Sequence, residues 1–267
     1  MKRPLAAAVI MLTALIAWAP AAESKVTIAG DPCSVPLIAK LAKAYSDKNR
    51  TFSAEVTTLS CTLGVYKAAD GEADIGVSTQ NGLDENLPKG AVNRVIARSP
   101  IVLVVNRDNP VEGVTYEELK GIFSGKIKNW KEAGGPDLRI ENVMLAPCVR
   151  HTMGKQVALY GEIDRLLPEG KVNPVEHTNR LVMENAGAIG QQIYGYESEG
   201  VKVLKIDGVL PDESTIGTEY TFYQDFNIVT RGEPAGEARE FMDFIGSDEG
   251  SRIIRSLRHI PARAGLR

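Results

Sequence analysis

The stretch Gly30-Asp31-Pro32-Cys33-Ser34-Val35-Pro36-Leu37 lies between a short apolar run, residues 26–29, and an amphipathic segment, residues 37–45. This order predicts a strand that turns directly into a helix. Such a turn directs backbone N–H groups and the positive end of a helix dipole at one point, which suits the binding of an anion or another small ligand. Cys33 stands in this turn where serine or threonine would be the usual residue. The sequence therefore places a thiol in a ligand-binding position.

The same pattern recurs downstream. Residues 52–58 alternate in polarity like a half-buried strand, and residues 62–69 have a helical pattern. Cys61 lies at the turn between them, and Thr62 is a candidate cap for the helix. A second cysteine thus occupies a predicted strand-to-helix turn.

A short buried strand at residues 73–77 follows and leads into a polar loop that contains Ser78. The βαβαβ order of the first part of the chain predicts an α/β fold with a parallel sheet. Ligands of such sheets bind at the carboxyl ends of the strands. We expect Cys33, Cys61 and Ser78 to lie at that edge.

The rest of the chain continues the alternation of strands and helices. Thr115 and Glu118 form a capping box that predicts a helix ending near Phe123. Cys148 follows a predicted strand at residues 143–145 and precedes helical residues, so the third cysteine also lies at a strand-to-helix turn. Further strands are predicted at residues 101–105, 188–189, 201–206 and 226–229, and further helices at residues 178–185, 235–245 and 248–257.

Residues 1–21 have the three parts of a secretory signal peptide: Lys2 and Arg3, an apolar run at residues 5–18, and small residues at 19–21. About 14 apolar residues are too few to span a bilayer, so we expect cleavage near residue 22 and no membrane insertion of the mature chain. The predicted location of the mature chain is outside the cytoplasm.

The charge of the chain argues against anionic macromolecular partners. The formal net charge of the 267 residues is −3, and loss of Lys2 and Arg3 with the signal would make it −5. Nucleic acids and anionic lipids select basic surfaces. We expect neither nucleic acid nor a membrane among the partners.

The chain has three cysteines, an odd number for an exported protein. At least one thiol must stay free, pair between chains or bind something. One interpretation is a disulfide between Cys33 and Cys61 with Cys148 left over. The other is a site of three convergent thiolates, which would select a soft ion such as Cu(I) or zinc over a hard oxyanion.

Several segments, spread over nearly the whole mature chain, are typical of one known family. The likeness lies in Thr27-Ile28-Ala29-Gly30, Val35-Pro36-Leu37, Gly71-Glu72-Ala73-Asp74-Ile75-Gly76, Val105-Asn106-Arg107-Asp108-Asn109-Pro110, Phe123-Ser124-Gly125-Lys126-Ile127-Lys128-Asn129-Trp130, Gly187-Ala188-Ile189-Gly190 and Phe241-Met242-Asp243-Phe244-Ile245. Together these segments resemble the periplasmic phosphate-binding proteins, the type II substrate-binding proteins of phosphate transporters. The Phe-Ser-Gly-Lys-Ile-x-Asn-Trp block is the most specific of them.

The resemblance implies a two-lobed α/β fold of the Venus-flytrap type, with two strands crossing between the lobes, and a binding protein rather than an enzyme. Applied to this sequence, it assigns residues 22–104 and 225–267 to the first lobe and residues 105–224 to the second. It also implies a ligand held between the lobes by the helix-start turns. No cofactor is expected.

The sequence departs from the family at its ligand-binding turns. Where the family has Ser-Thr-Ser, this chain has Asp31-Pro32-Cys33, and where the family has Ser-Ser it has Cys61-Thr62. The Gly-Ser-Gly-Thr-Arg turn of the second lobe is replaced by residues 149–153, directly after Cys148. A thiol is a poor hydrogen-bond donor and a worse acceptor, so these residues do not predict ordinary phosphate recognition.

A phosphate-binding scaffold with cysteines in its cleft is similar to the arsenite-binding periplasmic proteins that signal to a sensor histidine kinase and so regulate arsenite oxidation. This resemblance implies that Cys33, Cys61 and Cys148 bind As(III) and that the partner is the periplasmic domain of such a kinase, or else an ABC permease. Phosphate, another oxyanion, zinc or Cu(I) is the alternative ligand, and His151 could complete a zinc site. Secondary candidates for the site are Ser34, Thr62, Ser78, Arg150 and His151, of which Arg150 would favour the thiolate form.

An enzyme is the rival hypothesis from a different class. Cys148 could act as a nucleophile with His151 as its base. The sequence offers neither a Cys-x-x-Cys pair nor an identifiable third group to orient the histidine. The sequence therefore favours a binding protein.

Overall fold

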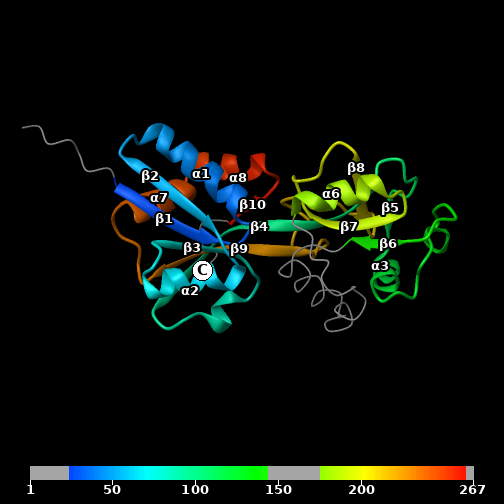
Figure 1. Ribbon diagram of the computed structural model, residues 1–267, viewed down its shortest axis with the longest axis horizontal. Helices are drawn as coiled ribbons and strands as arrows, with labels where there is room; N and C mark the ends of the chain where they lie inside the picture. The colour runs from blue at the N-terminus through cyan, green and yellow to red at the C-terminus, as the bar shows by residue number, and fades with distance from the viewer. Residues whose placement is uncertain (1–23, 144–174, 263–267) are drawn as a thin grey trace, which may run out of the picture.

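A computed structural model describes residues 24–143 and 175–262 of the chain. These residues form two α/β lobes, and the long strands β4 (Ala91–Asn106) and β9 (Tyr223–Arg231) run from one lobe to the other (Figure 1). The two-lobed architecture expected from the sequence is confirmed.

The first lobe is built on three parallel strands, β1 (Ser24–Gly30), β2 (Phe52–Thr58) and β3 (Ile75–Thr79). Helices α1 (Val35–Lys48), α7 (Gly236–Ile245) and α8 (Asp248–Ser256) pack on one side of these strands, and α2 (Cys61–Asp70) packs on the other (Figure 1). The predicted βαβαβ start is therefore correct, and it gathers the turns after β1, β2 and β3 at one edge.

The sheet as a whole is mixed rather than parallel. Its main path has the order β2-β1-β3-β9-β4-β7-β6. β9 runs antiparallel to β3 and to β4, because it returns from the second lobe after β4 has crossed to it. The prediction of a parallel sheet therefore holds for β1–β3 in the first lobe and for the pairs of strands at residues 141–143 with 188–193 and 113–114 with 201–206 in the second, but not for the sheet as a whole.

The second lobe surrounds the far half of β4. Its strands are β5 (Gly113–Val114), β6 (Glu141–Val143), β7 (Ala188–Ile193) and β8 (Val201–Ile206), and its helices are α3 (Tyr116–Phe123) and α6 (Val175–Glu184). The short 3-10 segments are η1 (Leu83–Asn86) in the first lobe and η2 (Trp130–Ala133) in the second, and the short strand β10 (Ile260–Pro261) pairs with β4.

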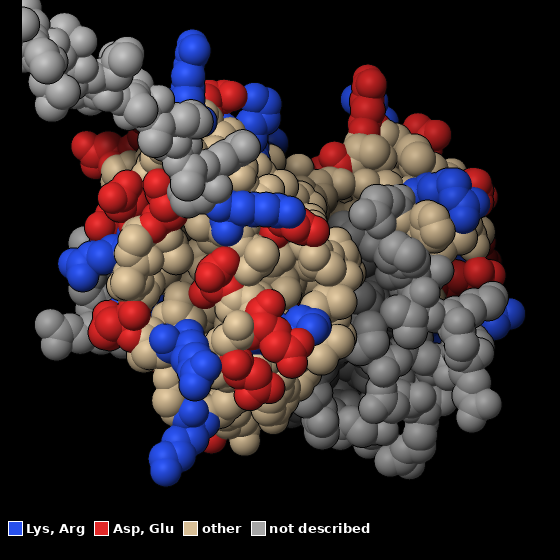
Figure 2. Space-filling view, turned by 60° about the vertical axis from the view of Figure 1, so that its left-hand side comes forward, with Lys and Arg blue, Asp and Glu red and all other residues tan. Residues whose placement is uncertain are grey.

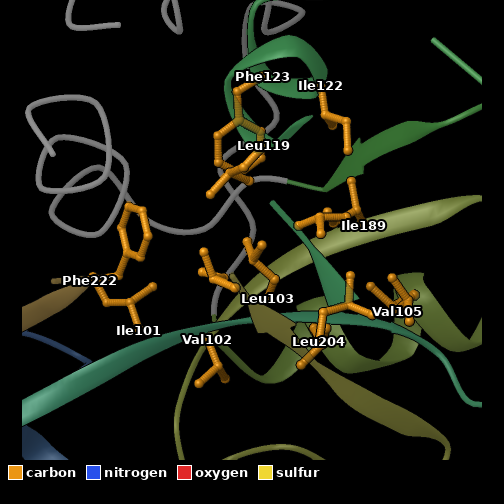
Figure 3. Close-up of a cluster of buried hydrophobic side chains, with 14 of the residues drawn as sticks. Ile101, Val102, Leu103, Val105, Leu119, Ile122, Phe123, Ile189, Leu204 and Phe222 are labelled. Atoms are coloured by element: carbon orange, nitrogen blue, oxygen red, sulfur yellow. The ribbon is translucent and has the colours of Figure 1, made fainter. Parts of the chain in front are cut away.

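The core of the second lobe explains the most specific sequence block. Leu103, Leu119 and Ile189 from β4, α3 and β7 converge on one another (Figure 3). Trp130 is fully buried in the same cluster, and its indole Nε1 donates a hydrogen bond to the carbonyl oxygen of Gly187 at 2.9 Å. The aromatic ends of the Phe-Ser-Gly-Lys-Ile-x-Asn-Trp block are thus core residues.

Several predicted boundaries are confirmed and others are wrong, among them those of β3, β6 and β7. The strands at residues 52–58 and 201–206 and the helix ending at Phe123 have the expected limits. β4 and β9 extend well beyond the predicted residues 101–105 and 226–229. The missed part of β4 crosses between the lobes and is only partly buried, so its side chains are not uniformly apolar. The predicted limits between the lobes fall inside β4 and β9, and the division remains a prediction.

Acidic and basic side chains alternate on the face of the first lobe shown in Figure 2, without a continuous field of one sign on that face. Among residues 24–143 and 175–262, no helix is both long enough and apolar enough to cross a membrane.

Candidate functional site

The carboxyl ends of β1, β2 and β3 meet at one edge of the first lobe. Gly30, the last residue of β1, is in register with Thr58 of β2 and Val77 of β3. The N–H of Leu59 donates to the carbonyl oxygen of Gly30 at 2.6 Å, so the turn after β2 lies beside the end of β1. The sheet edge is therefore present as predicted, and ligand binding at it stays a prediction.

Glycines allow α2 to approach this edge closely. A Cβ added to Gly64 would lie 2.5 Å from the carbonyl oxygen of Ala29 and 2.9 Å from Cα of Gly30. Only glycine fits such a contact without a backbone shift. The first turn of α2, which begins at Cys61, is therefore fixed against the end of β1.

Asp31 is the most heavily engaged polar residue of the α1 turn. Its side chain is completely buried. Oδ1 accepts hydrogen bonds from the N–H groups of Cys33 at 2.8 Å and Ser34 at 3.1 Å, and from the Thr79 hydroxyl at 3.2 Å. Oδ2 accepts from the N–H of Thr79 at 2.8 Å. Burial raises the pKa of Asp31 above its ordinary 3.8, and these hydrogen bonds oppose that shift.

The start of α1 is consequently occupied by a carboxylate of the chain itself. Besides the bonds from Cys33 and Ser34, the N–H of Val35 donates to the carbonyl oxygen of Asp31 at 3.1 Å. Pro36 has no N–H to offer. The backbone donors that would hold an anion at this helix terminus already serve Asp31.

Cys33 lies where the two lobes pack against each other. It precedes α1 in the first lobe, but its side chain packs with the buried hydrophobic cluster of the second lobe and is only 2% exposed. Ser34, a secondary candidate, is also buried, and its hydroxyl donates to the carbonyl oxygen of Asp31 at 2.9 Å. The Ser34 hydroxyl thus closes the turn.

Tyr196 and His259 lie next to this turn. Burial raises the pKa of Tyr196, and the neighbouring Cys33 and Asp31 raise it further. The phenol oxygen of Tyr196 is 3.4 Å from Nε2 of His259, and the rings meet edge to face. Burial lowers the pKa of His259 to about 4, so the imidazole is neutral at pH 7.

The chain around these two residues is held tightly. Arg258 donates from Nη1 to the Tyr194 hydroxyl at 2.7 Å, and its guanidinium carbon lies 4.7 Å from the centre of the Tyr194 ring. Gly195 has φ +97°, and a Cβ there would lie 2.5 Å from the carbonyl oxygen of Leu257. The segment after β7 and the segment before β10 therefore pack directly against each other.

Two predicted site residues differ from expectation. Ser78 is a buried residue of β3 rather than a loop residue, because β3 continues to Thr79 through its pairing with β9. Its hydroxyl has no hydrogen-bond partner among the described residues. Thr62 is exposed and does not cap α2, because Ser60 takes that role by accepting from the N–H of Leu63.

The convergence of the three cysteines is not tested. Cys61 begins α2, but its side chain lies outside the described part of the structure, and Cys148, Arg150 and His151 lie outside it altogether. Within the described residues, no group of three or more His, Cys, Asp or Glu side chains could hold a metal ion. The three-thiolate site and the Cys33–Cys61 disulfide both remain predictions.

Sequence reasoning missed Asp31, Tyr196 and His259 as site residues. An acidic residue within four positions of a helix start was a usable signal for Asp31, since carboxylates bind helix N-termini. No local pattern could identify Tyr196 and His259, because they are 63 residues apart and meet only in the fold.

Comparison with known proteins identifies the family. Residues 17–144 match the pattern of a PBP superfamily domain. Over 242 residues the chain is 30% identical to the phosphate-binding protein PstS of Bacillus subtilis strain 168, covering 87% of this chain and 79% of that protein. The chain belongs to the PstS-like family of the PBP superfamily.

Solved structures of PstS-like proteins have the same fold. A phosphate ABC transporter substrate-binding protein of Clostridium perfringens, solved with bound phosphate, is 27% identical with a TM-score of 0.79, and the match covers 90% of this chain and all of that one. An ABC-type phosphate transport receptor of Vibrio cholerae is 24% identical with a TM-score of 0.70, over 89% of this chain and 99% of that one, and supports the fold alone. These PstS-like relatives are binding proteins rather than enzymes.

Proposed function

We propose that this chain is an exported, periplasmic solute-binding protein that captures As(III) between its lobes through Cys33, Cys61 and Cys148. Membership of the PstS-like family supports the general role of binding a small solute. The particular ligand is inferred from the residues at the helix starts. The proposal requires the side chains of Cys61 and Cys148 to converge on Cys33.

The observation that carries the proposal is the position of Cys33. It lies at the start of α1 in the first lobe and packs against the core cluster of the second. A solute bonded to this sulfur would therefore contact both lobes. Such a ligand favours the closed arrangement because it gains contacts there that the open arrangement lacks.

Thiol chemistry selects the ligand class. Thiolates prefer soft, thiophilic centres, and hard oxyanions are held by strong N–H and O–H donors. Arsenous acid, As(OH)₃, is uncharged and can condense with three thiols to form three As–S bonds. Each As–OH leaves as water with one thiol proton, so the step needs no oxidant or reductant. The pyramidal product leaves a lone pair on arsenic in the fourth direction.

Phosphate is the second candidate ligand, and the relatives favour it over arsenite. The PstS of B. subtilis is named for phosphate, and the C. perfringens protein was solved with phosphate bound. The α1 turn argues in the other direction, because the N–H groups of Cys33 and Ser34 are engaged by Asp31. The two candidates therefore rest on different observations and predict different affinities.

The relatives also favour an ABC permease over a sensor histidine kinase as the partner. The C. perfringens protein is an ABC transporter component. A kinase periplasmic domain is the alternative, and co-purification of the As(III)-loaded protein with each candidate partner distinguishes them. Binding to the kinase domain alone would assign a sensor role.

Titration calorimetry of the reduced protein tests the ligand. We expect tight 1:1 binding of As(III) and no comparable heat from phosphate, and tighter binding of zinc or Cu(I) than of As(III) would make that metal the ligand. Cys33→Ser, Cys61→Ser and Cys148→Ser should each abolish tight As(III) binding, whereas the control Thr62→Ser, on the exposed start of α2, should retain it. Tight phosphate binding that survives all three cysteine substitutions would assign the chain to the second candidate.

A further inference from the structure

We propose that Asp31 is a specificity-determining residue: its buried carboxylate takes the place of a ligand anion at the start of α1, so that the site admits an uncharged oxyacid and rejects oxyanions. This inference rests on the proposed function for the location of the ligand beside Cys33. It adds the charge of the ligand as the selected property, and it assigns that selection to one side chain.

Both carboxylate oxygens of Asp31 are fully engaged by hydrogen-bond donors. Its two carboxylate oxygens accept from Cys33 N, Ser34 N, Thr79 N and Thr79 Oγ1, at 2.8 to 3.2 Å. Four donors, with no acceptor partner among the described residues, are the pattern of an ionised carboxylate. An oxyanion in the same place would have to displace Asp31 from these donors or do without them.

The surroundings of Asp31 supply no full positive charge from the described residues. Among the described residues, no Lys or Arg forms an ion pair with Asp31. Tyr196, the neighbouring phenol, is uncharged, and so is His259 beyond it. The carboxylate is therefore stabilised by N–H groups and by the helix dipole, which supply only partial positive charge. A second negative charge would compete for the same partial charges and would be repelled by the first.

A role of Asp31 in ligand selectivity must be distinguished from its role in holding two strands together. Asp31 ties β3 to the end of β1, which alone could justify its presence. Asp74 makes an equivalent tie at the opposite ends of these strands: Oδ2 accepts from Thr27 N at 2.8 Å and from Thr27 Oγ1 at 2.7 Å. Asp74 is exposed and directly precedes β3, at the other end of that strand from Thr79, so its tie needs no buried charge. Asp74→Ser is thus a matched control for loss of a cross-strand carboxylate.

Calorimetry with arsenate and inorganic phosphate on the reduced protein tests this inference. Asp31→Ser removes the charge and returns the N–H groups of Cys33, Ser34 and Thr79 to the site. We expect it to bind phosphate and arsenate at least about tenfold more tightly than the wild-type protein, since a nearby like charge is removed. Asp74→Ser should leave the affinity for both anions unchanged. Circular dichroism on each variant verifies the fold.

Asp31→Asn is the second variant, because it keeps the shape of the side chain and one acceptor oxygen if Asp31→Ser does not fold. Equal anion affinity in the wild-type protein and a folded Asp31 variant would overturn the inference, as would tight phosphate binding by the wild-type protein. Failure of As(III) binding by the wild-type protein, with a gain of anion affinity in Asp31→Ser, would instead overturn the proposed As(III) ligand and leave the role of Asp31 intact.

Discussion

The phenol oxygen of Tyr196 lies 3.4 Å from Nε2 of His259, which joins the segment after β7 to the segment before β10. His259 is only 2% exposed, and its Nδ1 has no hydrogen-bond partner among the described residues. Protonation would place a positive charge in a site that does not solvate it. Protonation of His259 should therefore destabilise the packing between the segment after β7 and the segment before β10.

The stability of the fold should therefore fall as the pH is lowered from about 6.5 to about 4. The pKa of His259 is lowered from 6.5 to about 4 in the folded protein, so the unfolded chain binds more protons within this window. Stability contributed by the neutral imidazole is complete above pH 6.5 and decreases on acidification, by up to about 3 kcal/mol. Chemical denaturation across this pH range measures the effect.

His259→Gln should flatten this part of the pH profile, whereas His177→Gln should leave it unchanged because His177 is exposed. An identical loss of stability between pH 6.5 and 4 in the His259 variant would show that other groups cause it.

Substitutions of Ser60 and Thr62 should differ in their effect on stability, because only Ser60 caps α2. Ser60→Ala should destabilise the protein by about 0.5–2 kcal/mol, because it removes the hydroxyl that accepts from the N–H of Leu63 at 3.2 Å. Thr62→Ala should change the free energy of unfolding by less than about 0.5 kcal/mol, since Thr62 is exposed and has no capping role. Equal effects in urea denaturation would contradict the assignment of the cap.

Gly64 should tolerate no side chain. A Cβ would lie 2.5 Å from the Ala29 carbonyl oxygen, so Gly64→Ala must push α2 away from β1, at a cost of about 1–3 kcal/mol. Gly246→Ala is the control, because its Cβ would meet nothing closer than 3.6 Å and its φ of −73° suits alanine. Thermal unfolding compares them, and a Gly64 variant as stable as the control would show that α2 is not fixed by this contact.

The sequence was sufficient to predict local elements in both lobes. Alternating polarity defined β2, and the capping box at Thr115 defined the start of α3, because both signals lie within a few residues. The mixed sheet could not be predicted in this way. The direction of β9 depends on the chain returning from the second lobe, which no local pattern records.

The candidate site was predicted only in part. Cys33 does lie beyond the carboxyl end of β1, as the strand-to-helix pattern indicated. The engagement of the α1 amides by Asp31 was not predicted, because it requires Thr79 from β3 to lie beside the turn. The cap of α2 was assigned to Thr62 instead of Ser60 because both residue types suit the position and only the backbone distinguishes them.

The central claim is that As(III) binds to three sulfurs, and arsenic K-edge X-ray absorption on the As(III)-loaded, reduced protein tests it most directly. We predict a first coordination shell of three sulfur atoms in the wild-type protein and loss of that shell in Cys33→Ser. An oxygen-only shell, or bound arsenic whose sulfur shell is unchanged in Cys33→Ser, would contradict the claim.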